Sequence, residues 1–566
     1  MQWHAPSSQV RNLGWGHDLP LAPVKPVSDR ASESRLQAGE PVEAFRIRSV
    51  VRTVPQAVWA VSALFASLLL AYVVLLPIYR APDEVDHVDA VYELEQGEGW
   101  AEPGTDLLDP PVITSLHLSG LLTLQHYPAA AAPPQRAKRS FDTLPGTIDP
   151  SQTNQITQHP PLFYALDAVP LKVVGGTSWA YDKTVLFLRL LSALMVLPLP
   201  VLAHAAARRV RGPGALAVTA SILPLAVPQL VHIGASVNND NLLTLLFGLL
   251  TVALMYVVTG DLSRGTAVRI GVLSALALLT KGFAFIVPVW IGLTYILALC
   301  RYRRRTALTS ALVALAVTTL LGGWWWLRNL LKYGAVQPAG EKPITPPPGF
   351  VPNLHLLLNQ YGYLPKSFWG AFGYFNVVLP DTEIKAATWV LAVGVVLALV
   401  APGRFAIDRA LVLAAPFLGL LILLMLLSRR TYLSTGQFRG LQGRYMFPGI
   451  VGASVLVAGG LVGPLRRAGR WVPLLAVALA GVMQAYAARA ILNGFWRPID
   501  GNASYADALH TLFVWSAWPK PIAAAALAAP LLFGLLAAGA LARTRSRLAP
   551  GPCKLPGARH LGPGGC

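Results

Sequence analysis

The chain has 566 residues, of which 54% are hydrophobic and 13% are charged, and its formal net charge is +19. Soluble proteins carry about 25% charged residues, so this composition excludes an ordinary soluble enzyme and predicts a polytopic membrane protein. The basic residues gather in short gaps between apolar runs, which indicates membrane topology under the positive-inside rule and no nucleic-acid partner. The three cysteines, at positions 300, 553 and 566, predict neither a disulfide framework nor a cysteine metal site.

Residues 1–50 are polar and are predicted to form a disordered cytoplasmic tail with no cleavable signal peptide. A single membrane domain at residues 51–545 follows, and residues 546–566, rich in glycine and proline, are predicted to be a second disordered cytoplasmic tail. The fold class is predicted to be all-α, with about twelve transmembrane helices of about 20 apolar residues each. The predicted spans are residues 54–77, 183–207, 213–233, 241–259, 268–281, 283–299, 307–327, 385–402, 410–428, 445–463, 471–489 and 521–542. An even number of spans places both termini in the cytoplasm, while the two short spans beside Lys281 have the alternative of forming one broken helix.

Two long loops then lie outside the cytoplasm, at residues 78–182 and 328–384. The first contains fourteen acidic and five basic residues, which reverses the charge of the cytoplasmic gaps. Its apolar stretch at residues 160–174 is short and flanked by prolines, so we expect a juxtamembrane helix on the membrane surface there. The second loop is rich in proline, glycine and aromatic residues.

An acidic motif, Pro-Asp-Glu-Val-Asp-His at residues 82–87, comes soon after the first span. Proline suits the first turn of a helix, and carboxylates are stabilised at its positive N-terminal end. Asp83 and His87 are four residues apart and therefore share a helix face. A carboxylate fixed at the membrane surface can accept a proton from a substrate hydroxyl, so Asp83 and Glu84 are candidate general bases. The alternative is a well-capped juxtamembrane helix with a solvated acidic face.

Two further polar motifs are expected on the same side of the membrane. His159 precedes two prolines where the first loop returns to the membrane, and it either donates to a phosphate or caps the interface. Asp240 belongs to the run Ser-Val-Asn-Asn-Asp-Asn at residues 236–241, in a tight turn where asparagine and aspartate are also ordinary turn residues. The topology would let Asp240 face the same cavity as Asp83.

Arginines at positions 429, 430, 439 and 444 lie in one short outer loop, where the positive-inside pattern disfavours them. The planar guanidinium suits phosphate, so this loop is a candidate anion site, and Tyr445 follows directly. Lys281 and Arg328, at the outer ends of their spans, would add to the same positive basin. The alternatives are pairing with the acidic first loop or an error in the topology.

The acidic motif, His-Pro-Pro-Leu-Phe-Tyr at residues 159–164 and Gln-Gly-Arg-Tyr at residues 442–445 together resemble the GT-C type of membrane glycosyltransferase. More narrowly, they resemble an uncharacterised bacterial branch of predicted surface-polysaccharide glycosyltransferases, and the resemblance extends over residues 54–545. It implies a GT-C-like fold and inverting transfer of a sugar from a polyprenyl-phosphate donor to a hydroxyl acceptor, on the outer face of the bacterial plasma membrane. Asp83 would be the catalytic residue, with Glu84 as a near alternative. The candidate substrate-binding residues are His87, His159, Asp240, Lys281, Arg328, Arg439, Arg444 and Tyr445.

The expected partners are the lipid-linked donor, the bilayer and a hydroxyl acceptor on an envelope glycan, glycolipid or protein. Residues 83, 84, 86 and 87 would suffice as ligands for a divalent metal ion, and the sequence leaves a metal requirement open. The main alternative function is a transporter or flippase for a lipid-linked anion. Such a protein needs ionisable residues near the bilayer centre, and the predicted spans contain almost none.

Overall fold

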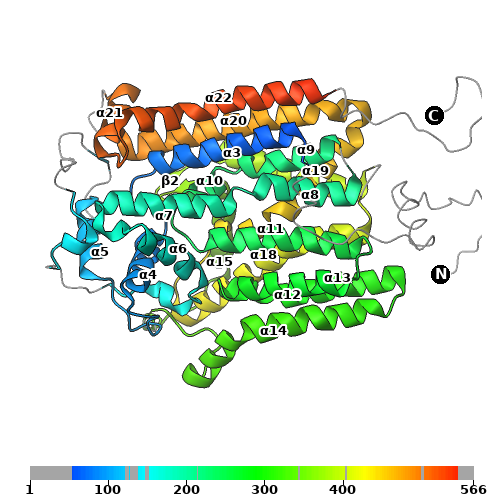
Figure 1. Ribbon diagram of the computed structural model, residues 1–566, viewed down its shortest axis with the longest axis horizontal. Helices are drawn as coiled ribbons and strands as arrows, with labels where there is room; N and C mark the ends of the chain where they lie inside the picture. Colours follow the sequence, from blue (N-terminus) through cyan, green and yellow to red (C-terminus); the bar gives the residue numbers. More distant parts are fainter. Residues whose placement is uncertain are drawn as a thin grey trace, which may run out of the picture. The chain divides into compact units, whose positions relative to one another are not determined.

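The structure is a computed structural model that describes residues 54–120, 126–127, 138–146, 152–212, 214–341, 344–401, 405–498 and 503–545. The predicted tails at residues 1–50 and 546–566 lie outside the described residues. The described part is built almost entirely of helices (Figure 1). Its only strands are the two-residue β1 (Ala371–Phe372) and β2 (Val377–Val378), which pair antiparallel.

Long helices form the body of the bundle. They are α3 (Gln56–Leu75), α7 (Tyr181–Val196), α8 (Leu199–Arg211), α11 (Asp240–Val258), α12 (Arg264–Leu278), α13 (Ile286–Tyr302), α14 (Thr306–Tyr333), α17 (Asp381–Val400), α18 (Ile407–Thr435), α19 (Ile450–Val462), α20 (Val472–Ile491) and α22 (Lys520–Thr544). Shorter helices connect them or cover one end. They are α4 (Glu84–Gln96), α5 (Pro110–Leu118), α6 (Leu162–Val173), α9 (Ala215–Ile222), α10 (Pro228–Gly234), α15 (Leu354–Tyr361), α16 (Tyr363–Trp369) and α21 (Tyr505–Trp515). The single turns are η3 (Phe141–Thr143), η4 (Gln155–Gln158), η5 (Gly176–Ser178), η6 (Leu223–Ala226), η7 (Gly282–Phe285), η8 (Gly443–Gly449), η9 (Gly463–Trp471) and η10 (Leu492–Trp496).

Each of the twelve predicted spans coincides with a helical segment. Within the described residues, nine helices are long and apolar enough to cross a membrane, or ten if the bent pair of α9–η6 and α10, which meet at 69°, forms one span. This count takes residues 443–496 as one helix, although the backbone turns between α19 and α20 at Arg466, with φ of 44°. The all-α polytopic membrane architecture is therefore confirmed, while the number twelve stays a prediction.

The arginine-rich gaps meet at one end of the bundle, which we call the arginine end. Side-chain contacts join the end of α8 to the start of α18, the end of α13 to the end of α11 and to the start of α18, and the end of α22 to the end of η9. The contacting pairs are Arg409 with the carbonyl of Val210, Tyr302 with the carbonyl of Val258, Arg301 with Asp408, and Arg545 over the ring of Trp471. This clustering is what the positive-inside rule predicts for a single membrane face.

The chain reverses direction at Lys281, which decides between the two predictions for this segment. α12 begins near the arginine end, where Ser310 at the start of α14 donates to the carbonyl of Leu262. α13 finishes at the same end, because Tyr302 donates to the carbonyl of Val258. α12 and α13 are therefore two separate helices of opposite direction, and the broken-helix alternative is wrong.

The opposite end, which we call the Asp83 end, carries the first predicted loop folded into α4, α5 and α6 (Figure 1). α6 lies against α4, and Lys172 donates to the carbonyl of Glu95 at 2.7 Å. On its other side α6 exposes Leu166 and Val169, as expected for a helix whose apolar face meets lipid. The predicted juxtamembrane helix is thus present.

The second loop contributes a segment at residues 334–341 that lies across the first loop. Gln337 donates to the side chain of Gln158, and a Cβ at Gly340 would meet the carbonyl oxygen of Gln155 at 2.3 Å. Only a glycine allows this approach of the two backbones. An ion pair between Glu341 and Arg439 anchors the far end of the segment.

We predict that the arginine end is cytoplasmic and the Asp83 end is extracytoplasmic. Single cysteines introduced by Ser178→Cys and Thr306→Cys, in a chain whose own cysteines are replaced by serine, occupy exposed positions at the two ends. An impermeant maleimide applied to intact cells should label only the first, and both after permeabilisation. Equal labelling of both in intact cells would reject this topology.

Candidate active site

Arg444 is buried at the Asp83 end because η8 packs tightly on α16. The backbone N–H of Gly443 donates to the hydroxyl of Ser367 at 2.8 Å, and a Cβ at Gly443 would lie 2.5 Å from the carbonyl oxygen of Leu364. The glycine of the Gln-Gly-Arg-Tyr motif is therefore a steric requirement. It brings the Arg444 side chain, which is 1% exposed, into the interior.

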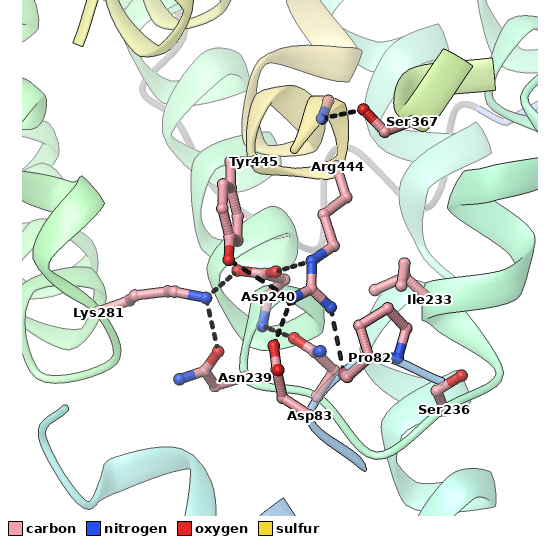
Figure 2. Close-up of polar contacts among 12 residues, drawn as sticks. Pro82, Asp83, Ile233, Ser236, Asn239, Asp240, Lys281, Ser367, Arg444 and Tyr445 are labelled. Atoms are coloured by element: carbon pink, nitrogen blue, oxygen red, sulfur yellow. Dashed lines mark hydrogen bonds and ion pairs between the residues drawn. The ribbon is translucent and has the colours of Figure 1, made fainter. Parts of the chain in front are cut away.

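The guanidinium of Arg444 contacts carboxylates from two distant parts of the chain (Figure 2). Its Nη2 lies 2.5 Å from Oδ2 of Asp83, and its Nε lies 3.8 Å from Oδ2 of Asp240. Its Nη1 also donates to the carbonyl of Pro82 at 3.3 Å. Two carboxylates compensate a charge that could not otherwise be buried.

Lys281 completes this group from the turn between α12 and α13. Its Nζ donates to Oδ1 of Asp240 at 2.7 Å and to Oδ1 of Asn239 at 3.1 Å, and lies 4.9 Å from the ring centre of Tyr445 (Figure 2). We call Asp83, Asp240, Lys281 and Arg444 the Arg444 cluster. Two cations and two carboxylates thus alternate within it.

Asp83 occupies an unusual backbone conformation at the start of α4. Its φ of 63° and ψ of 10° lie in the left-handed region, and Tyr79 four residues earlier has φ of 62°. This region costs roughly 1–2 kcal/mol for most residues, and aspartate is among those that tolerate it best. The Asp83 side chain is 24% exposed, so it is the carboxylate of the cluster that a substrate can reach.

Glu84, the other predicted base, points elsewhere. Its side chain is fully buried and forms two hydrogen bonds with Arg189 of α7, from Nε at 2.7 Å and from Nη2 at 2.6 Å. A carboxylate held in this way is not available to take a proton from a substrate, so we do not retain Glu84 as a base.

His87 belongs to a hydrogen-bonded chain that begins at Lys281. Asn239 accepts from Lys281 through Oδ1 and donates through Nδ2 to the hydroxyl of Tyr164 at 3.1 Å. That hydroxyl also forms a hydrogen bond with Nδ1 of His87, 3.0 Å away. Burial, followed by the charges of Lys281 and Arg444, holds the pKa of His87 well below its usual value, so the ring is neutral.

His159 lies in the same region and is 8% exposed. Burial and the nearby Lys281 charge hold its pKa well below the usual value, and its Nδ1 is buried without a hydrogen-bond partner in the structure. Asp83, Asp240, Lys281, Arg444, Tyr445, His87 and His159 are thus brought together as the sequence predicted.

Arg328 and Arg439 are not brought into the cluster. Arg328 lies over the ring of Trp325 and donates to Asn329, and Arg439 forms its exposed ion pair with Glu341. The structure therefore removes both from the positive basin that the sequence predicted, because their own local partners hold them outside it.

Of the four proposed metal ligands, Glu84 is bound to Arg189 and His87 to Tyr164, whereas Asp83 and Asp86 both accept a hydrogen bond from Gln155. Three acidic side chains further along α4 and in the following loop, Asp89, Glu93 and Asp106, have ligand oxygens within 4.8 Å of one another. Burial raises the pKa of Asp89 well above its usual value, and burial with the charges of Asp106 and Asp109 raises the pKa of Glu93 to about 8. A raised pKa favours the protonated form of a carboxyl, which lowers the repulsion between these neighbouring acids.

Three residues of the site were missed at the level of sequence. Arg189 is a charged residue inside a predicted span, and a charge at that depth is by itself a signal of a specific partner. Gln155, which donates to Oδ1 of Asp83 at 3.2 Å, and the role of Asn239 follow only from the three-dimensional contacts.

The arrangement combines one partly exposed carboxylate, Asp83, with two buried cations in the same cluster. Such a site can bind a phosphate through Arg444 and Lys281 and accept a proton at Asp83.

The model of a protein family described as "Predicted membrane protein (DUF2142)" matches residues 65–453. The chain belongs to this family. The matched range contains the whole Arg444 cluster together with Glu84 and Arg189, and the family description agrees with the polytopic membrane architecture of this DUF2142 protein.

A search of curated proteins gives no match. Among solved structures, the DUF2142 protein is similar to ArnT from Cupriavidus metallidurans bound to undecaprenyl phosphate, with 14% identity, a TM-score of 0.45, and coverage of 86% of this chain and 77% of that chain. It is also similar to the oligosaccharyltransferase of Archaeoglobus fulgidus in complex with Zn and sulfate, with 13% identity, a TM-score of 0.33, and coverage of 72% of this chain and 53% of that chain.

Asp86, next to the cluster, predicts a pH dependence of stability. It is 4% exposed, and burial followed by the charge of Asp83 raises its pKa to about 7. The folded state therefore binds more protons than the unfolded state between about pH 4 and pH 7, so stability falls as pH rises through this window. Asp86→Asn should raise the free energy of unfolding at about pH 8, on the order of 2 kcal/mol more than at about pH 5.

Thermal unfolding of the full-length protein in detergent at both pH values measures this difference. Asp142→Asn, an exposed change of the same kind in η3, is the control and should shift neither midpoint. An equal effect of Asp86→Asn at the two pH values would contradict the raised pKa.

Proposed function

We propose that the protein is a glycosyltransferase that moves a sugar from a polyprenyl-phosphate donor to a hydroxyl acceptor with inversion at the anomeric carbon. The observation that carries this proposal is the contact of the partly exposed Asp83 with Arg444, itself buried against Asp240. A base and a phosphate-binding cation are thereby held in contact in one site, at the end of the bundle just beyond the first span. The undecaprenyl phosphate in the ArnT crystal structure is a ligand of the class that we propose.

The role of the two cations is to stabilise the leaving group. When the anomeric carbon–oxygen bond breaks, the lipid phosphate gains negative charge, and a guanidinium and an ammonium that are already in place stabilise that charge without reorganising. Arg444 offers a planar donor set to phosphate oxygens, and Lys281 adds a second positive charge through its contact with Asp240.

The carboxylate serves the acceptor. The acceptor oxygen attacks the anomeric carbon from the face opposite the phosphate, a new carbon–oxygen bond forms as the old one breaks, and the hydroxyl proton passes to Asp83. Direct displacement of this kind inverts the configuration. A neutral imidazole such as that of His87 is suited to hydrogen-bond the sugar or the phosphate without adding charge.

Donor binding and base release are linked in this proposal. Asp83 and Arg444 neutralise each other before substrate arrives, and a phosphate that takes over the guanidinium frees the carboxylate for the acceptor hydroxyl. Asp83 thus becomes available as a base only when the donor is bound, which limits proton transfer to Asp83 in the absence of donor.

We further propose that the site faces the outside of the bacterial plasma membrane and that both termini are cytoplasmic. The gathering of arginine-rich gaps at the far end of the bundle supports this orientation. Transport of a lipid-linked anion is the alternative, but Arg189 inside α7 is bound to Glu84 and to three backbone carbonyls, so this intramembrane charge is not free to carry a substrate.

Asp83→Asn should abolish transfer while keeping the fold. Asparagine tolerates the left-handed backbone and retains the shape of the side chain, but it cannot accept the proton, so turnover should fall about 10²–10⁴-fold. Purified full-length protein is assayed with a panel of polyprenyl-phosphate sugars, with and without a chelator. Glu98→Gln is the matched control, and near-normal transfer by Asp83→Asn would exclude Asp83 as the base.

Arg444→Gln should weaken binding of polyprenyl phosphate. A charge-assisted contact contributes about 1.5–3 kcal/mol, so the dissociation constant should rise at least about tenfold. Arg430→Gln removes an exposed arginine from the end of α18 and should leave the dissociation constant unchanged. Equal affinities of the two variants would remove Arg444 from the donor site.

A further inference from the structure

The carboxylate of Glu84 is used completely by four hydrogen bonds. Oε1 accepts from Nε of Arg189 at 2.7 Å and from the backbone N–H of Val237 at 3.1 Å. Oε2 accepts from Nη2 of Arg189 at 2.6 Å and from the backbone N–H of Tyr79 at 2.9 Å. The side chain is 0% exposed, so a substrate cannot reach it.

All the hydrogen-bond donors of the Arg189 guanidinium likewise have partners. Besides its two bonds to Glu84, it donates from Nη1 to the carbonyls of Val73 and Leu76 and from Nη2 to the carbonyl of Pro77. These carbonyls lie at and just after the C-terminal end of α3, where a helix has no backbone partners for its last oxygens. The Glu84–Arg189 pair therefore fixes where the first span stops and where the turn toward α4 begins.

That turn contains two of the five non-glycine residues with positive φ in the described chain, and the pair holds both. Tyr79 donates its N–H to Glu84, and Asp83 immediately precedes Glu84. Non-glycine residues persist in the left-handed region only where their surroundings over-determine the backbone. Here the surroundings include the buried Glu84–Arg189 pair, which is bonded to the turn near its start and at its end, beside the contacts of the Asp83 side chain with Arg444 and Gln155.

The Glu84–Arg189 pair also fixes the position of Asp240, the second carboxylate of the Arg444 cluster. Val237, whose N–H binds Glu84, lies three residues before Asp240 in the turn that leads into α11. One buried carboxylate thus joins the backbone of the Asp83 turn to the backbone of the Asp240 turn. The distance between Asp83 and Asp240, which lie on either side of Arg444, depends on this connection through Glu84.

We propose that Glu84 and Arg189 are positioning residues that hold Asp83 in the left-handed conformation and at its distance from Arg444 and Asp240. They act through Asp83 and do not touch substrate. The proposal rests on the proposed function in one respect only, namely that Asp83 is the base whose position matters for turnover.

The test replaces both partners together, because removing one alone would leave a buried unpaired charge and risk unfolding. The double variant Glu84→Gln/Arg189→Gln removes both charges and keeps amide groups near the freed backbone atoms. The matched control is Lys138→Gln/Asp182→Asn, which removes another buried ion pair that involves α7, with Nζ to Oδ2 at 2.5 Å, and does not contact the Asp83 turn.

Three measurements are made on the full-length protein: the thermal midpoint, kcat and KM for the donor, and carbodiimide-dependent coupling of an amine to Asp83, followed by peptide mass spectrometry. In the Glu84/Arg189 variant we expect kcat to fall about 10²-fold with a donor KM within about threefold, because a displacement of about 1 Å at a reacting group costs that much. Coupling at Asp83 should become several-fold faster. The control variant should change the thermal midpoint but neither kcat nor coupling at Asp83.

Loss of kcat in both double variants, in proportion to lost thermal stability, would show that the pair is merely structural and overturn the proposal. Unchanged kcat and unchanged coupling in the Glu84/Arg189 variant would also overturn it. If the unaltered protein transfers no sugar from any donor, the proposed function fails, and the coupling rate at Asp83 still decides whether the pair positions this residue.

Discussion

Compensation of buried charge is the constraint on which this end of the molecule depends. Arg189 and Arg444 are each 1% exposed, and an uncompensated guanidinium at that depth would be strongly destabilising. Glu84 compensates the charge of Arg189, and Asp83 and Asp240 compensate the charge of Arg444. Each pairing joins segments more than a hundred residues apart, so the ends of several helices are set by where the charges can meet.

The two buried arginines differ in how many of their hydrogen-bond donors have partners. This difference distinguishes a structural ion pair from one that is suited to bind a ligand. Around Arg189 every donor has a partner and no atom is left for a ligand. Around Arg444, Nε is 3.8 Å from its carboxylate, and Oδ2 of Asp240 has no hydrogen-bond partner among the residues that the structure describes. An incompletely satisfied buried group of this kind is expected where a ligand completes the site.

Much of the fold could be predicted from sequence because membrane spans are a local property. A run of apolar residues identifies a helix without knowledge of its neighbours, and the arginine gaps orient the set. The position of Asp83 directly after a span and the anomalous arginine at position 444 were likewise visible locally. The two short spans that meet at Lys281 were predicted as well, and the contact of Tyr302 removes the alternative of one broken helix.

The pairing of side chains could not be predicted in the same way. Glu84 and Asp83 are neighbours in sequence and equally acidic, yet one meets Arg189 across 105 positions and the other meets Arg444 across 361. Arg439 and Arg444 are similarly alike in sequence, and only Arg444 is turned inward, by the close packing of Gly443 on α16. Which member of such a pair takes part in the site is decided by tertiary packing.

The left-handed backbone at position 83 also constrains how this site can evolve. Glycine, asparagine and aspartate are the residues that adopt this conformation readily, and glutamate is not among them. Of the three, only aspartate carries a carboxylate, so the backbone and the proposed chemistry together admit a single amino acid. Its codons differ from those of asparagine and glycine by single nucleotides. One point mutation in the gene would therefore remove the proposed base while the product still inserts and folds, which would leave a stable but inactive protein in the membrane.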